Sequence, residues 1–429
     1  MFGTVGTGGS VEILIAGAGI GGLTAALSLH HVGFDRVRIV EAAPELRPLG
    51  AGVNLLPNAV RELAALGLFG ELAAVSARTD EIGYYARTGG LIWRDDRSAG
   101  SGHRWPQLSL HRGRLHTVLT EAVRARLGAD AIVTDARLTG FTELPDGRLE
   151  AALDHGRGTS SSTLRADVLV GADGIRSAVR ATLYPDEGAP SWQGATVWRG
   201  TTWVPPFLGG TSMLVTGDGT QKVVAYAMSP EPDAEGRVLV NWAASRPVDD
   251  GADADRSDWN RPVPQTKFLP HFEGWDLGFL DVTALLADSA GAFEYPMLDR
   301  DPLPRWSFGH TTLLGDAAHA MCPMGSGGTT QAIIDARALA YCLATGGNTE
   351  DALAAYEEHR RPAMTELQLA NRNMGPEIVI DMTYDRAPEG FRRASDVIPA
   401  AELADVARHH AEIGAFDPVA ASTGSPWTV

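Results

Sequence analysis

The chain has 429 residues, 44% of them hydrophobic, and a formal net charge of −17 at pH 7. That length exceeds one ordinary hydrophobic core, so two or three packed subdomains are expected. An acidic chain is repelled by phosphate backbones and anionic lipid surfaces, which argues against a nucleic-acid partner and against a stable membrane association. The two cysteines, Cys322 and Cys342, are too few for a disulfide framework and indicate a reducing, cytoplasmic location.

The first predicted elements form a strand, a turn, a helix and a second strand. Residues 1–10 are rich in Gly, Ser and Thr without a basic residue, which predicts a flexible leader rather than a signal peptide. A buried strand is expected over residues 11–16, a helix over residues 23–31 and a second strand over residues 36–41. The turn at residues 17–22 reads GAGIGG. This order is the context that a dinucleotide-binding fingerprint requires.

Each glycine of this turn has an expected role. Gly17 makes the tight turn, Gly19 lets the backbone approach a pyrophosphate, and Gly22 lets helix and strand pack closely. Glu41 ends the second strand, where a carboxylate can accept hydrogen bonds from a ribose and would repel a 2′-phosphate. The unit therefore predicts a site for FAD or NAD rather than for NADP.

A second motif, DGIRSAVR, follows a buried strand and starts a helix near Ser177. Its first residue is Asp173, which sits at the end of the strand. An acid at this place is a candidate for dinucleotide binding. The alternative is that Asp173 and Arg180 form a structural pair.

A third motif decides between FAD and NAD. A strand over residues 311–314 runs into GDAAHAMCPMGSGG. The carboxylate of Asp316, at the strand end, can accept a hydrogen bond from a polyol hydroxyl, and only FAD has a ribityl chain. The alternative for Asp316 is a capping or salt-bridge acid. His319 is expected to be structural rather than a catalytic base.

The glycine-rich end of this motif leads into a long helix expected over residues 329–344, with Thr329 or Thr330 as its N-cap. Gly325 and Gly328 lie in that lead. A helix N-terminus favours an anion, and the pyrimidine edge of a flavin becomes negative on reduction. The motif therefore predicts a second flavin contact.

The region between the second and third motifs predicts a mostly antiparallel sheet that covers the flavin. The expected strands are residues 194–203, 213–216, 222–228 and 238–243, with further strands near residues 84–93. About two of five aromatic residues in these segments are expected to face a cavity, a share typical of ligand pockets. The five are Trp198, Trp203, Trp242, Tyr226 and Tyr295.

Two residues of this sheet are candidates for the active cavity. Strand alternation places Arg199 on the face opposite Trp198, where its charge would lie over the flavin or a substrate anion. The alternative is an arginine on the outer surface of the sheet. Tyr226 has a phenol that could orient a ring hydroxyl, and the alternative is an ordinary buried tyrosine.

With these three motifs in this order, the chain resembles the single-component FAD-dependent aromatic hydroxylases of the p-hydroxybenzoate and salicylate hydroxylase group. The resemblance covers roughly residues 11–370. The stretch from residues 109–113 through residues 295–304 looks most like the branch that contains 5-methylphenazine-1-carboxylate monooxygenase. Residues 371–429 match only a subset of relatives.

The resemblance implies roles for further residues. Arg112 would reach the FAD phosphates and ribityl chain, and Asp316 would bind the ribityl chain. Gly52 and Val53 would lie beside the flavin, and the carbonyl of Pro323 would lie near the substrate. Asp173 would serve both FAD and a transient nicotinamide. This chain has Thr330 where many relatives have Asn, which changes the expected contacts to the flavin pyrimidine.

The expected fold is α/β (α+β overall), with a Rossmann-like FAD-binding domain, an inserted β-sheet substrate domain and a helical C-terminal region. The FAD-binding domain is expected over residues 11–185 and 299–370, and the substrate domain over residues 186–298 plus strands near 80–95. A helical extension is expected over residues 371–429.

The expected function is hydroxylation of an electron-rich aromatic or heteroaromatic small molecule, with or without loss of a carboxylate. Non-covalent FAD, NADH or NADPH, and O2 are the expected cofactor and co-substrates, and the protein is expected to be a monomer or homodimer. A flavin oxidoreductase without oxygen insertion is one alternative. A non-catalytic binding module on the same fold is another, and the acid at Asp316 argues against it.

Overall fold

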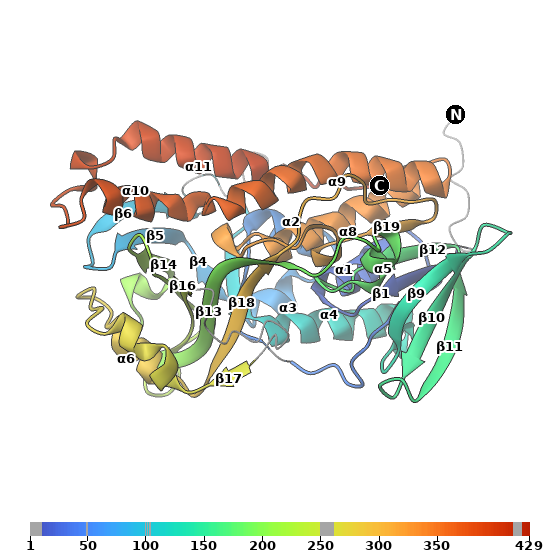
Figure 1. Cartoon of the computed structure of the whole chain (residues 1–429), viewed down its shortest axis with the longest axis horizontal. Coiled ribbons are helices and arrows are strands. Elements are labelled where there is room, and N and C mark those ends of the chain that lie inside the picture. Colours follow the sequence, from blue (N-terminus) through green and yellow to red (C-terminus); the bar gives the residue numbers. More distant parts are fainter. Residues whose placement is uncertain are drawn as a thin grey trace.

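The structure is a computed structural model that describes residues 11–48, 50–98, 100, 102, 104–248, 261–414 and 423–429. The predicted leader at residues 1–10 lies outside the described residues. The expected mixed α/β architecture is confirmed, with a parallel sheet, a larger mostly antiparallel sheet and a helical C-terminal region (Figure 1).

The parallel sheet has five strands in the order β19-β12-β1-β2-β8. Its central strand β1 is short and aliphatic, and every residue is buried. A parallel sheet covered by helices on both faces requires such continuous apolar strands. The strands are β1 (Ile13–Ala16), β2 (Val37–Val40), β8 (Ile132–Val133), β12 (Val168–Gly171) and β19 (Thr311–Leu313).

Helices from distant parts of the sequence cover this sheet. Helix α1 (Ile20–His31) packs against both α4 (Arg112–Leu127) and α8 (Gly328–Thr345). Helix α1 is apolar on most of its surface and largely buried, as expected for a helix packed inside a protein. The other helices of this half are α2 (Pro57–Ala65), α3 (Phe69–Ala73), α5 (Ala178–Leu183) and α7 (Asp316–His319).

The second large sheet has eight strands in the order β17-β18-β13-β16-β15-β14-β5-β6. All its pairs are antiparallel except β14 with β5. Each strand segment predicted from the sequence is present. The strands are β5 (Glu81–Ala86), β6 (Leu91–Asp96), β13 (Ser191–Val204), β14 (Ser212–Gly217), β15 (Lys222–Ala227), β16 (Val238–Pro247), β17 (Arg261–Val263) and β18 (Ala292–Asp299).

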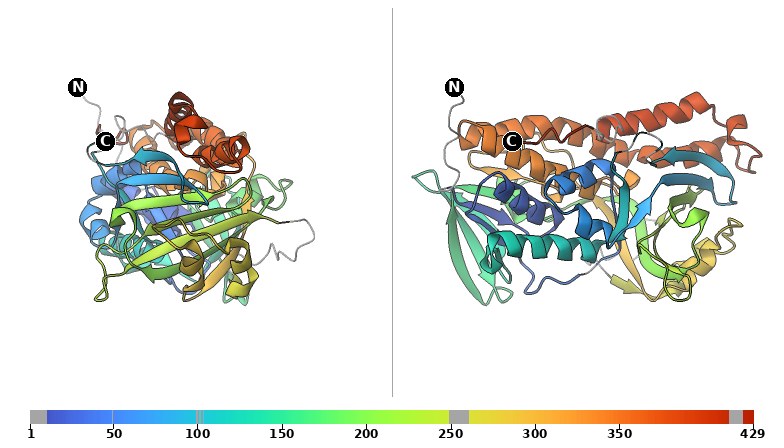
Figure 2. Two further views of the ribbon diagram at one scale, coloured as in Figure 1. Left: turned by 90° about the vertical axis from the view of Figure 1, so that its left-hand side faces the viewer. Right: turned by 180° about the vertical axis from the view of Figure 1, so that it is seen from behind.

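Two three-stranded sheets complete the β-structure. One, which sequence reasoning did not identify, lies at the end of the molecule away from the large sheet (Figures 1 and 2). It contains β9 (Arg137–Glu143), β10 (Leu149–His155) and β11 (Ser160–Ala166). The other contains β3 (Gly52–Leu55), β7 (Gln107–His111) and β4 (Ala77–Thr79).

The C-terminal helices run along one side of the whole molecule (Figure 1). They are α9 (Thr349–Arg372), α10 (Ile378–Arg386) and α11 (Ala400–Gly414). Helix α10 packs on β5 and β6, and its Val379 and Ile380 share one apolar cluster with Tyr226 of the large sheet. No helix among the described residues is long and apolar enough to cross a membrane.

Short helical turns connect these elements. The structure has one further α-helix, α6 (Val282–Ala287). The 3-10 turns are η3 (Ala129–Ala131), η4 (Leu208–Gly210), η5 (Gln265–Lys267), η6 (Leu269–Phe272), η7 (Met324–Ser326), η8 (Gly375–Glu377) and η9 (Ala394–Asp396).

A buried acid, Asp335 on α8, joins three elements of the nucleotide-binding half. Its carboxylate accepts hydrogen bonds from the Gly315 amide at 3.1 Å, His319 Nε2 at 2.6 Å and Arg360 Nε at 2.7 Å. Burial alone would raise the pKa of Asp335, but His319 and Arg360 outweigh it and hold the pKa below its usual value. His319 is fully buried and lies beside Trp306, so its expected structural role is confirmed.

Replacing Asp335 with Ala should destabilise the protein by about 3–5 kcal/mol, because it leaves the buried Arg360 and His319 without their acceptor. Chemical unfolding of the two purified proteins measures this difference. The matched control is Asp301→Ala, which removes a partner of Arg372 that is 74% exposed and should cost about 1 kcal/mol or less. Equal losses in both variants would contradict the role of Asp335.

Candidate active site

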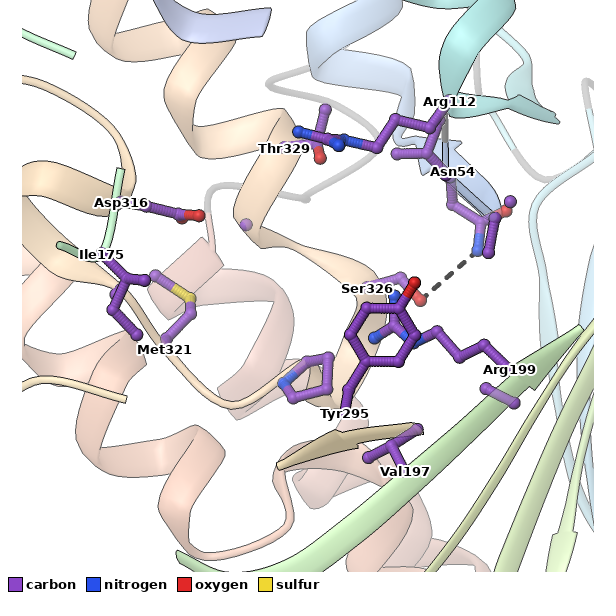
Figure 3. A pocket seen from close by; sticks show the side chains of 18 of the residues that line it. Asn54, Arg112, Ile175, Val197, Arg199, Tyr295, Asp316, Met321, Ser326 and Thr329 are labelled. Atoms are coloured by element: carbon purple, nitrogen blue, oxygen red, sulfur yellow. Dashed lines mark hydrogen bonds between the residues drawn. The ribbon is translucent and has the colours of Figure 1, made fainter. Parts of the chain in front are cut away.

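A cavity of about 440 Å³ lies where the parallel sheet, the β3-β7-β4 sheet and the eight-stranded sheet meet. Ligand pockets commonly occupy about 300–1,000 Å³. Side chains from well-separated segments line it, including Arg112, Arg199 and Asp316 (Figure 3). The predicted residues that line it are Gly19, Gly52, Val53, Arg112, Arg199, Tyr226, Asp316, Pro323 and Gly328. Gly17, Gly22, Glu41, Asp173 and Gly325 are not among the lining residues.

The first glycine motif has the geometry expected from its sequence. Gly17 has φ +101°, and a Cβ there would lie 2.5 Å from the Ala172 carbonyl oxygen. A Cβ on Gly22 would lie 2.0 Å from the Gly17 carbonyl oxygen. Gly19 is different, because nothing lies within 4 Å of its Cβ position and it borders the cavity. The turn and the close packing therefore need two glycines, while the third leaves room for a ligand.

Helix α1 begins beside this space without a side-chain cap, and its N-cap residue is Gly19. Glu41 lies at the end of β2 and accepts hydrogen bonds from the amides of Ala18 at 2.9 Å and Ala43 at 2.8 Å. His116 Nε2 contacts the Ala18 carbonyl at 2.7 Å. Burial lowers the pKa of His116, so the neutral ring holds this turn in place. An uncapped helix end of this kind favours an anionic group.

In the second motif, Asp173 and Arg180 each bond to other partners. The Asp173 carboxylate accepts hydrogen bonds from Ser177 Oγ at 2.5 Å and from the Ala178 amide at 2.7 Å, so it holds the start of α5. Arg180 does not pair with Asp173. Its guanidinium bonds to Glu187 and to the carbonyl oxygens of Ala317 and Ala318. The expected Asp173–Arg180 pair is wrong, because both side chains find closer partners within the fold.

The third motif carries a second uncapped helix end. Helix α8 begins at Gly328 with Gly327 as N-cap and no side-chain cap. The prediction of Thr329 or Thr330 as N-cap is wrong, because the helix starts earlier. The Thr330 hydroxyl instead accepts a hydrogen bond from the Leu56 amide at 3.1 Å. Asp316 is exposed and also borders the cavity.

The large sheet forms the other wall of the cavity. Arg199 and Tyr295 lie against each other, with the guanidinium carbon 5.4 Å from the ring centre (Figure 3). The buried Nε atom of Arg199 has no hydrogen-bond partner within the described part of the chain. Trp198, on the opposite face, is buried in the sheet core and donates to Glu294 at 2.9 Å. The predicted alternation of Trp198 and Arg199 is therefore confirmed.

Two of the five aromatic residues line the cavity, as expected. These are Tyr226 and Tyr295. Trp242 is fully buried in the same apolar cluster as Trp198, while Trp203 is 44% exposed. Burial raises the pKa of both Tyr226 and Tyr295, while Arg199 lowers each in part. The two phenols therefore stay protonated at neutral pH.

Gly52 brings the two halves of the cavity together. Its amide donates to Asn241 Oδ1 at 2.7 Å, and a Cβ there would lie 2.7 Å from the Tyr226 hydroxyl. Sequence reasoning missed Asn241, and it also missed the cavity-lining residues Lys222 and Glu377. A strand asparagine and a strand lysine carry no motif. Glu377 lies beyond the segment in which the three motifs occur.

The residues present fit FAD. Two uncapped helix ends, at Gly19 and Gly328, border one continuous cavity, and their amides would be donors for the pyrophosphate and the pyrimidine of an FAD. The same cavity is lined by Arg112, which provides a positive charge, and by Asp316, which provides an exposed carboxylate for hydroxyl groups (Figure 3). The open space at Gly19 is a cradle that a side chain would fill.

Comparisons with known proteins agree with this reading. A model of the FAD binding domain family matches residues 10–255 and 288–369, so the chain belongs to that family. Several relatives are named as hydroxylases or monooxygenases. Phenazine 1,6-dicarboxylic acid hydroxylase PhzS of Lysobacter antibioticus is 44% identical over 86% of this chain and 90% of its own length. 3-Hydroxybenzoate 6-hydroxylase 1 of Aquipseudomonas alcaligenes is 32% identical over 84% of this chain and 88% of its own length.

A solved structure shows the same fold. Klebsiella pneumoniae HpxO in complex with FAD and uric acid superposes with a TM-score of 0.72 at 22% identity, and the match covers 96% of this chain and 97% of that one. The protein is accordingly an FAD-dependent aromatic hydroxylase of the p-hydroxybenzoate and salicylate hydroxylase type.

Substituting alanine at the two glycines should separate folding from cofactor binding. Gly22→Ala places a methyl group against the Gly17 backbone, so the FAD-free protein should unfold at a clearly lower temperature. Gly19→Ala should leave the FAD-free protein as stable as the wild type but weaken FAD binding, because its methyl group enters the cavity. Thermal unfolding and flavin titration measure the two effects. Normal FAD binding by Gly19→Ala would argue against this placement of the cofactor.

Asp316→Ala should stay folded and bind FAD roughly 10- to 150-fold more weakly, the effect of losing one charge-assisted hydrogen bond. The matched control is Asp385→Ala, an exposed acid on α10 far along the chain from the three motifs. Flavin titration of both FAD-free variants gives the dissociation constants. An unchanged constant for Asp316→Ala would remove this residue from the site.

Proposed function

We propose that the protein is an NADH- or NADPH-dependent monooxygenase that hydroxylates a planar, fused-ring heteroaromatic acid, with phenazine carboxylic acids as the nearest substrate class. The observation that carries this proposal is the single cavity that runs from two anion-binding helix ends to a sheet wall with Arg199 and Tyr226. The 44% identical relative is named for a phenazine dicarboxylic acid, which supports the substrate class.

The proposal assigns a role to each predicted residue. FAD, held without a covalent bond, supplies electron transfer and oxygen activation when it is bound. Asp173 and Gly325 contribute through their positions in the backbone, since the carboxylate of the first and the amide of the second are bonded to protein. The proposed FAD contacts that line the cavity are Gly19, Gly52, Val53, Arg112, Asp316 and Gly328. Gly17, Gly22 and Glu41 are proposed to serve FAD by shaping the turn before α1.

The chain's own residues then position the ring and exclude water. The uncapped end of α8 offers amide donors to negative charge that develops on the pyrimidine edge. Arg199 supplies a fixed cation whose Nε is not engaged by the described protein. Tyr226 carries a neutral phenol that can donate to a substrate oxygen or nitrogen, and the Pro323 carbonyl can accept from the other side. Together these groups hold the ring in one place.

The substrate wall favours a flat, extended molecule. Between Lys222 and Tyr226 on β15 stands Val224, and beside it on β16 stands the small Ala243. Polar groups thus lie at both ends of a smooth apolar strip. A flat ring system can pack on such a strip while its substituents reach polar groups at either end.

Oxygen incorporation tests this function. Purified enzyme with NADH or NADPH, oxygen-18 gas and phenazine-1,6-dicarboxylic acid should yield a product that contains one oxygen-18 atom per ring hydroxylated. NAD(P)H consumption that produces only hydrogen peroxide or an oxygen-free product would favour a flavin oxidoreductase instead. A cytoplasmic location and a monomer or homodimer are part of the same proposal, and the buried free thiols of Cys322 and Cys342 support the former.

Arg199→Ala and Tyr226→Phe should keep FAD near wild-type content but divert reducing equivalents into hydrogen peroxide. A ring displaced by about 1 Å can react on the order of 100-fold more slowly. Trp203→Phe, an exposed position on β13 outside the cavity, is the matched control and should stay coupled. The ratio of hydroxylated product to NAD(P)H consumed measures the effect. Fully coupled turnover in both cavity variants would return Arg199 and Tyr226 to a structural role.

A further inference from the structure

The C-terminal region contributes a buried acid to the substrate end of the cavity. Glu377 closes the turn η8, beyond the last residue matched by the family model, and is 7% exposed. It lines the cavity together with Lys222, which is also 7% exposed. Burying an acid and a lysine beside a ligand cavity costs desolvation free energy. The fold does not need these two charges, so a role in ligand binding is the better explanation.

The two residues reach this place from different elements. Lys222 starts β15, on the same face of the strand as Tyr226 and four residues away, which corresponds to about 13 Å between Cα atoms. Glu377 is placed by the left-handed Met374, with φ +70°, which turns the chain from α9 into η8. The Lys222 end of the cavity is therefore the end remote from the Gly52 contact.

A third residue, Asp381 on α10, holds the lysine. Lys222 Nζ lies 2.9 Å and 3.0 Å from its two carboxylate oxygens, and the Asp381 side chain is 27% exposed. An ammonium has three donors, so Asp381 leaves Lys222 able to donate into the cavity. The series of charged groups Glu377, Lys222 and Asp381 therefore extends from a buried side chain to one in contact with solvent.

Charged groups around Glu377 decide its protonation. Burial is the main cause that raises the pKa of Glu377; Lys222 and the Gly325 amide oppose it, Asp381 adds to it, and the net pKa is about 7. Tyr84 on β5 also faces it, and burial keeps that phenol protonated. Turn η8 packs against α9, α10, α11 and η7. Of the groups on these elements, the Asp381 charge on α10 and the Gly325 amide on η7 act on the Glu377 carboxyl.

We propose that Lys222 and Glu377 form a carboxylate subsite, in which an acid group of the substrate pairs with the ammonium while Glu377 carries a proton and donates to it. With Glu377 protonated, the cluster of Lys222, Asp381 and Glu377 is neutral and can accept one more negative charge. With Glu377 ionised, the cluster is already negative and repels the ligand. Binding of an acid to the ionised form therefore takes up one proton from solvent.

This subsite rests on the proposed function and refines its substrate class. Arg199 on β13 and Lys222 on β15 are two strands and two residues apart, since Arg199 pairs with Ala243 and Ala243 with Val224. Those spacings place their Cα atoms about 12 Å apart. Two cations at opposite ends of a flat strip match a fused-ring aromatic with an acid group at each end.

The test measures binding to the FAD-loaded enzyme as a function of pH, by the change in flavin absorbance. The probes are phenazine-1,6-dicarboxylic acid and its uncharged diamide. Because the protonated form of Glu377 binds the acid, affinity falls as pH rises through its pKa. For a pKa of about 7, the dissociation constant of the diacid should be about tenfold higher at pH 8 than at pH 6. That of the diamide should not change.

Variants assign the effect to its residues. Glu377→Gln should bind the diacid with the same affinity at pH 6 and pH 8, while Lys222→Gln should weaken diacid binding at least about tenfold at pH 6 and spare the diamide. Asp381→Asn should move the midpoint to lower pH, because it removes a charge that raises the Glu377 pKa. Asp385→Asn, exposed on the same helix, is the control and should behave as the wild type. Unchanged flavin content and melting temperature show that each variant is folded.

The outcomes separate this inference from the proposed function. A diacid affinity that is independent of pH in the wild type, or still pH-dependent in Glu377→Gln, contradicts the subsite. So does an enzyme that hydroxylates the diamide but binds no diacid, and that result leaves the monooxygenase function intact. An enzyme that binds the diacid with the predicted pH dependence but incorporates no oxygen supports the subsite and contradicts the proposed reaction.

Discussion

The close approach of Gly52 to the large sheet is the constraint on which the site depends. Its amide donates to Asn241, 189 positions away in sequence, and a Cβ on residue 52 would lie only 2.7 Å from the Tyr226 hydroxyl. This contact sets the separation between the β3-β7-β4 sheet and the eight-stranded sheet, and so sets the depth of the cavity between them. Any larger residue at position 52 would push the substrate wall away from the groups that hold the cofactor.

The cavity combines two kinds of chemistry because it lies between two kinds of structure. The parallel sheet directs strand ends and helix N-termini toward the cavity, and neither α1 nor α8 has a side-chain N-cap there. Their free amides are a fixed positive field that a bound anion can use without reorganisation. The antiparallel sheet contributes alternate side chains instead, so one face buries Trp198 and the other presents Arg199.

The C-terminal region has a part in the site that its sequence does not announce. Helix α10 covers β5 and β6, and the turn before it places Glu377 against the Gly325 loop and beside Lys222. The same segment therefore stabilises the sheet and completes the wall of the cavity. Because it lies outside the region shared across the family, a change in this segment can alter what the cavity accepts while the nucleotide-binding half stays the same.

The sequence by itself determined the nucleotide-binding half, the strand segments of the large sheet and the orientation of Arg199. These follow from local rules, since side chains alternate along a strand and a Cβ on Gly22 would meet the Gly17 backbone within the same turn. Only the tertiary structure decided which partners the polar side chains take. Arg180 donates to the distant carbonyl oxygens of Ala317 and Ala318, and the Thr330 hydroxyl accepts a hydrogen bond from the Leu56 amide instead of capping α8. Asn241 and Glu377 reached the cavity through contacts between segments far apart in sequence, because a hydrogen bond or a charge interaction depends on distance in space, which local patterns do not encode.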